Sequence, residues 1–352
     1  MIKHNWQLFC LVAMVILVTN LNGDAADYIT RKSTRKRIAG KIESFSRTEI
    51  TILVGLRNPK AQKIPIGDIH KVEWDGEPKI LKSARNAEAG GRLKYAYNNY
   101  KKTYDAITDP TSRLKIDLSY LLARIAAKRA ISGSAQLDDA IRQLTGFRSM
   151  NSLHFRYYEA SYFLGKCYLK QKNAKKAKQL FEEVQNVPGF ADLARLGLAQ
   201  SLVASGEAQK ALGLLDRAIR SAAGSPKNKM RAQLGRAMAL QTLKQHQKAV
   251  DQFDEIIATK EFQTSGLEAE TYFRQGVSYR ALGKPKNAVL AFLHVDLLYF
   301  SDTEHHPEAL FNLVQLWTEI GKPDRSNAAR TKLQNSYPQS EWAGKLTGSA
   351  ND

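Results

Sequence analysis

The chain has 352 residues, of which 43% are hydrophobic, and it carries a formal net charge of +19. This length and apolar content suffice for the cores of about two domains. The sequence holds only 2 cysteines, which excludes a fold held together by several disulfides.

Residues 1–25 have the pattern of a secretory signal peptide. Lys3 and His4 precede an apolar run from Leu8 to Leu21, and small residues mark a cleavage position after Ala25. The apolar run is shorter than the roughly 20 residues that a transmembrane helix needs. We therefore expect an exported protein in the periplasm or cell envelope, with an uncleaved N-terminal anchor as the alternative.

Cleavage at this position removes Cys10 and leaves Cys167 within a predicted helix. The exported chain then has no intramolecular disulfide, and Cys167 is expected to be a small buried side chain. The apolar core must then stabilise the fold by itself.

Basic residues are densest near the expected mature amino terminus. The five residues of this basic patch are Arg31, Lys32, Arg35, Lys36 and Arg37. In an exported protein such charge favours anionic lipid, acidic polysaccharide or acidic proteins, and no nucleic acid is expected as a partner. The alternative interpretation is a solvated cationic tail that keeps the protein soluble.

Residues 28–76 have the alternation and the β-branched content of short strands. Strands are expected at residues 37–46, 48–56, 62–66 and 69–74, separated or ended by turns at 57–60 and at Asp75-Gly76. Four or five such strands predict a small curled β-barrel module. His70 lies in the last strand, where a structural role is expected.

From residue 78 the apolar period changes to that of helices, and this region extends to residue 346 before a short disordered tail at 347–352. Small residues recur every 34 to 44 positions, at Ala96, Ala140, Ala177, Ala211, Ala249, Ala288 and Ser326. Small residues let the backbones of two antiparallel helices approach, and larger apolar residues fill the space beside them. A long first helix is expected from about Thr111 to Ser132.

These repeats resemble the tetratricopeptide repeat, whose period is about 34 residues. The best-matching residues are Leu164, Gly165, Tyr168, Ala177 and Phe181 in one repeat and Tyr272, Gly276, Tyr279, Gly283, Ala288 and Phe292 in another. The resemblance implies a mostly α fold, a tetratricopeptide-like α-solenoid of antiparallel helix pairs preceded by the β-barrel-like module. The first and last repeats depart from the pattern, as expected of capping repeats.

Three further resemblances concern the two ends and the overall layout. The runs Gly40-Lys41-Ile42, Glu49-Ile50-Thr51-Ile52 and Ile64-Pro65-Ile66 resemble SH3-like or Sm-like barrels. Residues 336–343 resemble the ending of envelope tetratricopeptide proteins. The order of signal, β module and repeat array resembles exported repeat proteins of bacteria such as planctomycetes.

In the tetratricopeptide family the first helices of the pairs line a concave face that usually holds a ligand peptide. Carried onto this sequence, the groove positions are Tyr162, Lys166, Lys170, Arg231, Phe273, Arg280, Phe311 and Gln315. Aromatic side chains beside cations suit a peptide with acidic groups. The alternative is that these are ordinary surface and inter-repeat residues.

Motifs that could carry chemistry are weak. Ser112 and Lys115 have the spacing of a serine–lysine pair but lack companion motifs, which indicates a chance match. The histidines and acidic residues between His294 and Glu308 could gather around zinc, but a helix cap at Ser301 or Asp302 and Pro307 in a first turn favour a solvated loop. No catalytic, cofactor-binding or metal-binding residue is predicted.

The sequence therefore favours an exported, non-enzymatic scaffold that binds a protein or peptide in the bacterial cell envelope. The alternative is a cationic adaptor that holds an anionic membrane or a cell-wall polymer through the basic patch and the β module. An enzyme with a site between the β module and the array is the third and weakest hypothesis.

Overall fold

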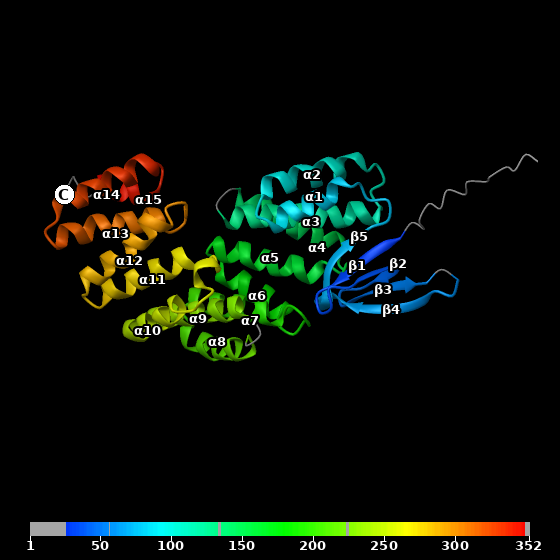
Figure 1. Cartoon of the computed structure of the whole chain (residues 1–352), viewed down its shortest axis with the longest axis horizontal. Coiled ribbons are helices and arrows are strands. Elements are labelled where there is room, and N and C mark those ends of the chain that lie inside the picture. Colours follow the sequence, from blue (N-terminus) through cyan, green and yellow to red (C-terminus); the bar gives the residue numbers. More distant parts are fainter. Residues whose placement is uncertain (1–25, 56, 133–134, 223–224, 349–352) are drawn as a thin grey trace, which may run out of the picture.

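The computed structural model describes residues 26–55, 57–132, 135–222 and 225–348. The predicted signal peptide lies outside this range. A small sheet comes first and a long array of helices follows, which confirms the predicted change of period near residue 78 (Figure 1).

The sheet has five antiparallel strands and a short 3-10 helix, η1. They are β1 (Asp27–Arg31), β2 (Arg37–Phe45), β3 (Glu49–Val54), β4 (Lys60–Pro65), η1 (Ile66–Asp68) and β5 (Ile69–Glu73). The strand order is β4-β3-β2-β1-β5, so the described strands form an open sheet with β4 and β5 at its edges. The expected curled barrel therefore does not close.

The sheet stays open because helices cover its apolar face. Its inward isoleucines, among them Ile29, Ile42 and Ile50, are fully buried. They share one apolar cluster with Phe155 and Phe190 from the helical array. Because the array covers the apolar face of the sheet, the strands have no need to curl round and cover it themselves.

The described helices form seven antiparallel pairs and a short final helix. They are α1 (Ile80–Ala89), α2 (Leu93–Ala106), α3 (Arg113–Ile131), α4 (Leu137–Met150), α5 (Tyr157–Lys170), α6 (Ala174–Val184), α7 (Ala191–Ala204), α8 (Ala208–Ser221), α9 (Pro226–Thr242), α10 (His246–Ile257), α11 (Glu268–Ala281), α12 (Pro285–Leu298), α13 (His306–Glu319), α14 (Pro323–Ser336) and α15 (Glu341–Gly348), with a 3-10 turn, η2 (Phe262–Thr264), before α11. The long helix expected near residues 111–132 is α3. The final helix α15 was not predicted separately, and residues 349–352 lie outside the described range.

The small residues that anchor the repeats occupy the positions predicted for them. All seven lie on the second helix of a pair, and each is at most 3% exposed. A Cβ atom on Gly165 of α5 would lie 2.9 Å from the ring of Phe181 on α6, and one on Gly276 of α11 would lie 2.8 Å from the ring of Phe292 on α12. The glycines are therefore needed because the aromatic ring of the partner helix occupies the space of a side chain.

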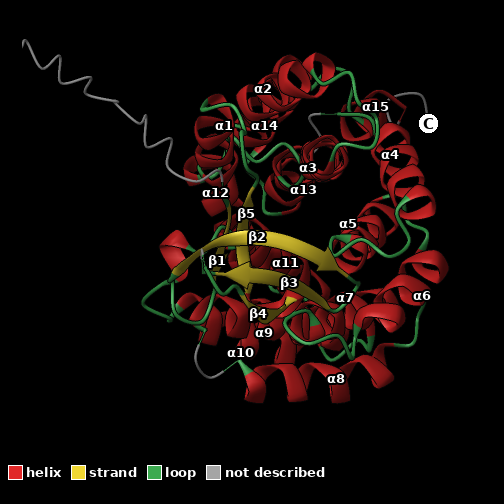
Figure 2. Ribbon diagram, turned by 90° about the vertical axis from the view of Figure 1, so that its right-hand side faces the viewer, coloured by secondary structure: helices red, strands yellow, loops and turns green. Residues whose placement is uncertain are grey.

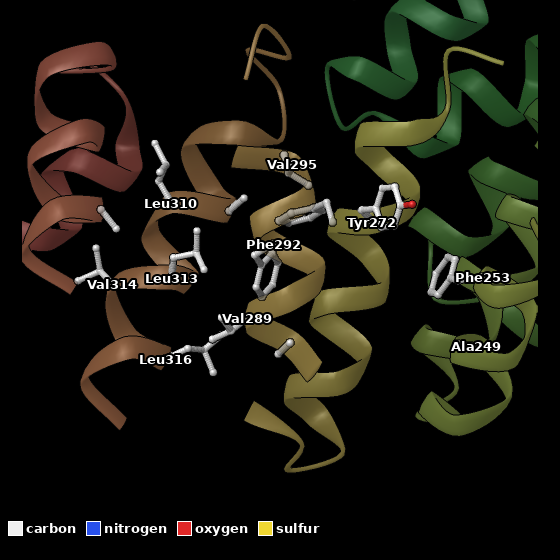
Figure 3. Close-up of a cluster of buried hydrophobic side chains, with 14 of the residues drawn as sticks. Ala249, Phe253, Tyr272, Val289, Phe292, Val295, Leu310, Leu313, Val314 and Leu316 are labelled. Carbon is white, nitrogen blue, oxygen red and sulfur yellow. The ribbon is translucent and has the colours of Figure 1, made fainter. Parts of the chain in front are cut away.

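The same packing continues from pair to pair. In Figure 3, Val289, Phe292 and Val295 of α12 face the leucines of α13 on one side and Tyr272 of α11 on the other. These side chains belong to one buried cluster that runs from α9 to α15. Such nearest-neighbour packing gives a solenoid its continuous core.

The pairs wind into a superhelix. In Figure 2, along the long axis, the first helices of the pairs lie nearer the axis and the second helices lie outside them. In the same view α13 lies behind α3 and α14 behind α1, so the array completes a superhelical turn.

The β module is fixed rigidly to the array. The Trp74 indole donates a hydrogen bond to buried Asp117 of α3 at 3.1 Å, and Arg113 donates to the carbonyl oxygens of Ile42 and Glu43. Gly67 of η1 lies directly against the backbone of Gly189, in the loop before α7. The sheet therefore forms one wall of the space around the first helices of the array.

Candidate binding groove

All eight residues predicted for the groove lie on first helices, namely α5, α9, α11 and α13. The structure brings three of them together and separates the others. Tyr162 and Lys166 of α5 and Arg231 of α9 line one cavity of about 170 Å³ between neighbouring repeats. This cavity is the centre of the candidate groove.

The walls of this groove cavity come from four successive first helices. The apolar side chains in these walls are Leu193, Leu196, Leu234, Met238 and Leu267. Gly197 and Gly235 also line the cavity, and a Cβ on Gly197 would lie 2.5 Å from the Phe181 ring. The cavity thus combines an apolar surface with a few polar groups, as binding sites commonly do.

Two cations in the groove cavity lack an acidic partner. Neither Lys166 nor Arg231 forms an ion pair within the described part of the chain, and Glu270 is the one carboxylate among the lining residues. Burial lowers the pKa of Lys166, and the charges of Arg231 and Lys128 lower it further. An anionic group bound here would offset both effects, because it favours the charged lysine.

The remaining groove predictions have other surroundings. Lys170 pairs with Glu304 of the α12–α13 loop at 2.6 Å, and Arg280 donates to the Asn312 side chain at 2.6 Å. The Phe311 ring packs against Trp342 of α15 with a centroid distance of 5.3 Å, and Gln315 is exposed. These four residues line the superhelix away from the groove cavity.

Phe273 does not fit the groove prediction. It is 3% exposed and packs against Phe292 and His305. The α12–α13 loop places His305 over Phe273, so this ring belongs to the core.

The basic patch is part of a folded hairpin, and the cationic-tail interpretation is wrong for these residues. Arg31 pairs with Asp68 at 2.5 Å, and Arg37 pairs with Glu73 at 3.1 Å and stacks on Tyr28. The other three patch residues, Lys32, Arg35 and Lys36, lie in the exposed β1–β2 turn. Ion pairing therefore removes part of the charge that the sequence pattern assigns to this surface.

The β1–β2 turn reaches two cavities at the junction between the β module and the array. One, of about 190 Å³, is lined by Lys32, His70 and Phe190 and shares Tyr162 and Leu193 with the groove cavity. The other, of about 500 Å³, shares His70, Arg124 and Arg156 with the first. A continuous series of hollows thus runs from the β module into the groove.

A buried ionic network lies beneath these junction cavities. Arg156 pairs with Asp117 at 3.0 Å and with Glu159 at 3.1 Å, and Arg124 joins Glu159 to Glu88. Burial by itself would raise the pKa of Glu88, but Arg124 and Lys128 hold it down to about 2. The network fixes α1, α3 and the start of α5 beside the β module.

The third hypothesis placed an enzyme site between the β module and the array but named no residues for it, because the residues that line the junction are far apart in the chain. His70 was assigned only a structural role, yet it lines both junction cavities. The one sequence feature that marked this region was the high density of basic residues in β1–β2. That feature does not indicate that α1 and α3 lie opposite the β1–β2 turn.

The residues of the weak chemical motifs have structural surroundings. Ser112 precedes α3, and the Lys115 amine donates to the Ile107 carbonyl oxygen at 2.5 Å. Cys167 is buried, which confirms the prediction of a small buried side chain, and burial raises the pKa of its thiol to about 11. The described residues contain no group of three or more potential metal ligands.

The segment around His306 differs from the predicted solvated loop. Pro307 lies in the first turn of α13, as expected. His306 itself is 2% exposed, and its ring nitrogens contact Asp296 at 2.9 Å and the Tyr337 hydroxyl at 2.8 Å. Asp296 also accepts a hydrogen bond from Lys332 at 2.6 Å, so these residues join the last two helix pairs.

No helix within the described ranges is long and apolar enough to cross a membrane. That finding concerns the β module and the array alone.

Comparison with known proteins identifies the repeats. The family profile for the tetratricopeptide repeat matches residues 133–189 and 196–265. A search of curated proteins finds no significant sequence match. The helical array is thus a tetratricopeptide-type solenoid, in agreement with the sequence prediction.

Solved structures share this fold at low sequence identity. A tetratricopeptide repeat protein from Parabacteroides merdae is 15% identical, with a TM-score of 0.55 over 76% of this chain and 96% of that chain. A Rap protein complexed with Competence and Sporulation Factor is 16% identical, with a TM-score of 0.56 over 74% of this chain and 76% of that chain. The apo quorum sensor NprR from B. thuringiensis is 12% identical, with a TM-score of 0.54 over 76% of this chain and 79% of that chain.

Proposed function

We propose that this chain of tetratricopeptide repeats is an exported, non-enzymatic scaffold that binds an acidic segment of a protein or peptide. The fold supports a role as a protein-interaction scaffold, since tetratricopeptide repeat proteins are generally scaffolds without catalytic activity. The Rap protein of the same fold is complexed with Competence and Sporulation Factor. The cell envelope as the location rests on the signal pattern of residues 1–25.

The observation that carries the proposal is the pair of uncompensated cations in the groove cavity. Lys166 and Arg231 lie among leucines and beside Tyr162. A ligand with a carboxylate next to an apolar side chain would satisfy both parts of this surface. Charge-assisted hydrogen bonds to a carboxylate are roughly twice as strong as neutral ones.

The test uses the purified protein and a display library of random peptides. We expect selected peptides to combine Asp or Glu with an apolar residue. The double variant Lys166→Glu/Arg231→Glu should weaken binding of a selected peptide by at least about tenfold, because two attractive contacts become repulsive.

The matched control is Lys175→Glu/Lys229→Glu, which changes the net charge equally at exposed positions on α6 and α9. Its affinity should stay close to that of the wild type. An equal loss in both double variants would show that overall charge governs binding, and the groove assignment would be wrong.

The second candidate function is adhesion to an anionic membrane or cell-wall polymer. It is supported by Lys32, Arg35 and Lys36, which are exposed together in the β1–β2 turn. Sedimentation with anionic vesicles or wall material should then fall as salt is raised, because salt screens exposed charges. Failure to sediment at low salt would reject this function.

A further inference from the structure

The larger junction cavity, of about 500 Å³, has an unusual concentration of basic residues. Its lining comes from the β1–β2 hairpin, β5, α1, α3 and the start of α5. The Lys and Arg residues among the lining are Arg35, Lys71, Arg85, Arg124, Lys128 and Arg156, and Glu88 is the one carboxylate. His70 also lines the cavity.

Part of this positive charge is already neutralised. Arg85 donates to both carboxylate oxygens of Glu77, and Arg156 is engaged by Asp117 and Glu159. Lys71 pairs with Glu73 at 3.0 Å, and the two terminal nitrogens of Arg124 pair with Glu88 and Glu159, which leaves its Nε. Such paired guanidinium groups contribute little to the binding of a further anion. Binding of a further anion therefore depends on the remaining donors.

Several donors keep free capacity. Arg35 and His70 form no ion pair within the described ranges, and the buried Nε of Arg124 has no acceptor there. Lys128 gives one hydrogen bond of 2.7 Å to Glu88, and an ammonium group can give three. An unsatisfied buried donor costs free energy, which an acceptor supplied by a ligand would recover.

The electrostatic surroundings of His70 agree with this count. Burial lowers the pKa of His70, and Arg35, Lys32 and Lys71 lower it further. The facing groups from the array are Arg124 and Arg156, with Glu159 beside them in the smaller junction cavity. In the two junction cavities the basic side chains around His70 outnumber the carboxylates, which are those of Glu88 and Glu159.

We propose that this junction cavity binds a phosphate group carried by a small molecule. Donors approach it from the hairpin, β5 and α3, and a tetrahedral anion with several oxygens can accept from all three directions. A planar carboxylate instead pairs best with a single guanidinium fork. The volume is within the usual range of about 300–1,000 Å³ for ligand sites.

This inference goes beyond the proposed function and does not depend on it. The groove cavity binds through Lys166 and Arg231, whereas the phosphate site uses Arg35, His70 and Arg124. Either site can fail its test while the other passes.

The experiment is calorimetric titration of the full-length chain with inorganic pyrophosphate at low salt. We expect saturable binding that is stronger than that of citrate, the carboxylate control. Arg35→Asn/His70→Gln should weaken it about tenfold, because a neutral amide replaces the charged guanidinium fork in one position and a ring that can become cationic in the other. Asn tolerates the left-handed backbone of Arg35, whose φ is 58°, so the hairpin should fold normally.

The matched control is Lys36→Asn, which removes the same charge from the next residue of the turn, outside the cavity lining. Its affinity should equal that of the wild type. A second readout is the NMR titration of His70, because bound pyrophosphate should raise the pKa of this ring. The proposal is overturned if pyrophosphate shows no saturable binding or if citrate binds as tightly. It is also overturned if Lys36→Asn loses as much affinity as the double variant, or if the His70 pKa does not move.

Discussion

Replacement of Gly189 by alanine should loosen the contact between the β module and the array. Gly189 has a φ of +81°, and a Cβ there would lie 2.8 Å from the Gly67 carbonyl oxygen. An L-residue in this conformation costs about 1–2 kcal/mol. Forcing an extra carbon into a packed contact adds about 1–3 kcal/mol, because the opposing atoms are backbone and cannot rotate away.

Gly206 is a matched control for this prediction. It has the same φ of +81°, and a Cβ there would have no atom within 4 Å. In urea unfolding followed by circular dichroism, Gly206→Ala should therefore lower the unfolding free energy only by the cost of the left-handed backbone conformation. Gly189→Ala should be less stable than this control by about 1–3 kcal/mol. Equal unfolding free energies for the two variants would refute the close approach of Gly67 and Gly189.

Three further predictions concern the core, the ionic network and the groove. Phe181→Ala should destabilise the fold by about 3–5 kcal/mol, because its ring fills the space between α5 and α7. The control is Leu290→Ala, at a 59% exposed position, which should change the unfolding free energy by less than about 0.5 kcal/mol. Similar losses in Phe181→Ala and Leu290→Ala would contradict the packing of Phe181 between the helices. The pKa of Glu88 falls from 4.5 to about 2 on folding, so its contribution of about 3 kcal/mol is present above pH 4.5 and is lost as the pH falls towards 2. Glu88→Gln should unfold with a weaker pH dependence across that window, and an unchanged dependence would contradict the ion pairs. In the groove, Tyr162→Ala should weaken the binding of a library-selected acidic peptide several-fold, whereas Phe273→Ala should chiefly lower the thermal stability. Peptide affinity and melting temperature, measured on both variants, check this difference.

Local pattern predicted most of the array. The anchor residues, such as Ala177 and Ala288, and the glycines opposite Phe181 and Phe292 follow from the sterics of a single helix pair. Placement of the groove residues on first helices follows from the same repeat. Phe273 was misassigned because the residue that covers it, His305, comes from a loop whose path the repeat pattern does not determine.

Contacts between distant segments could not be predicted in this way. Trp74 and Asp117 are 43 residues apart, and their hydrogen bond fixes the sheet against α3. The open sheet and the junction cavities depend on that docking. The density of basic residues indicated the β1–β2 hairpin as a charged surface. The rest of the larger junction cavity is lined by α1, α3 and Arg156, which the sequence pattern does not place opposite the hairpin.

The central claim is that the tetratricopeptide groove binds an acidic segment through Lys166 and Arg231. The most direct measurement is the affinity of a library-selected acidic peptide for the wild type, for Lys166→Glu/Arg231→Glu and for the charge-matched Lys175→Glu/Lys229→Glu. We predict at least about a tenfold loss in the groove variant alone. Unchanged affinity in the groove variant, or equal losses in both variants, would contradict the claim.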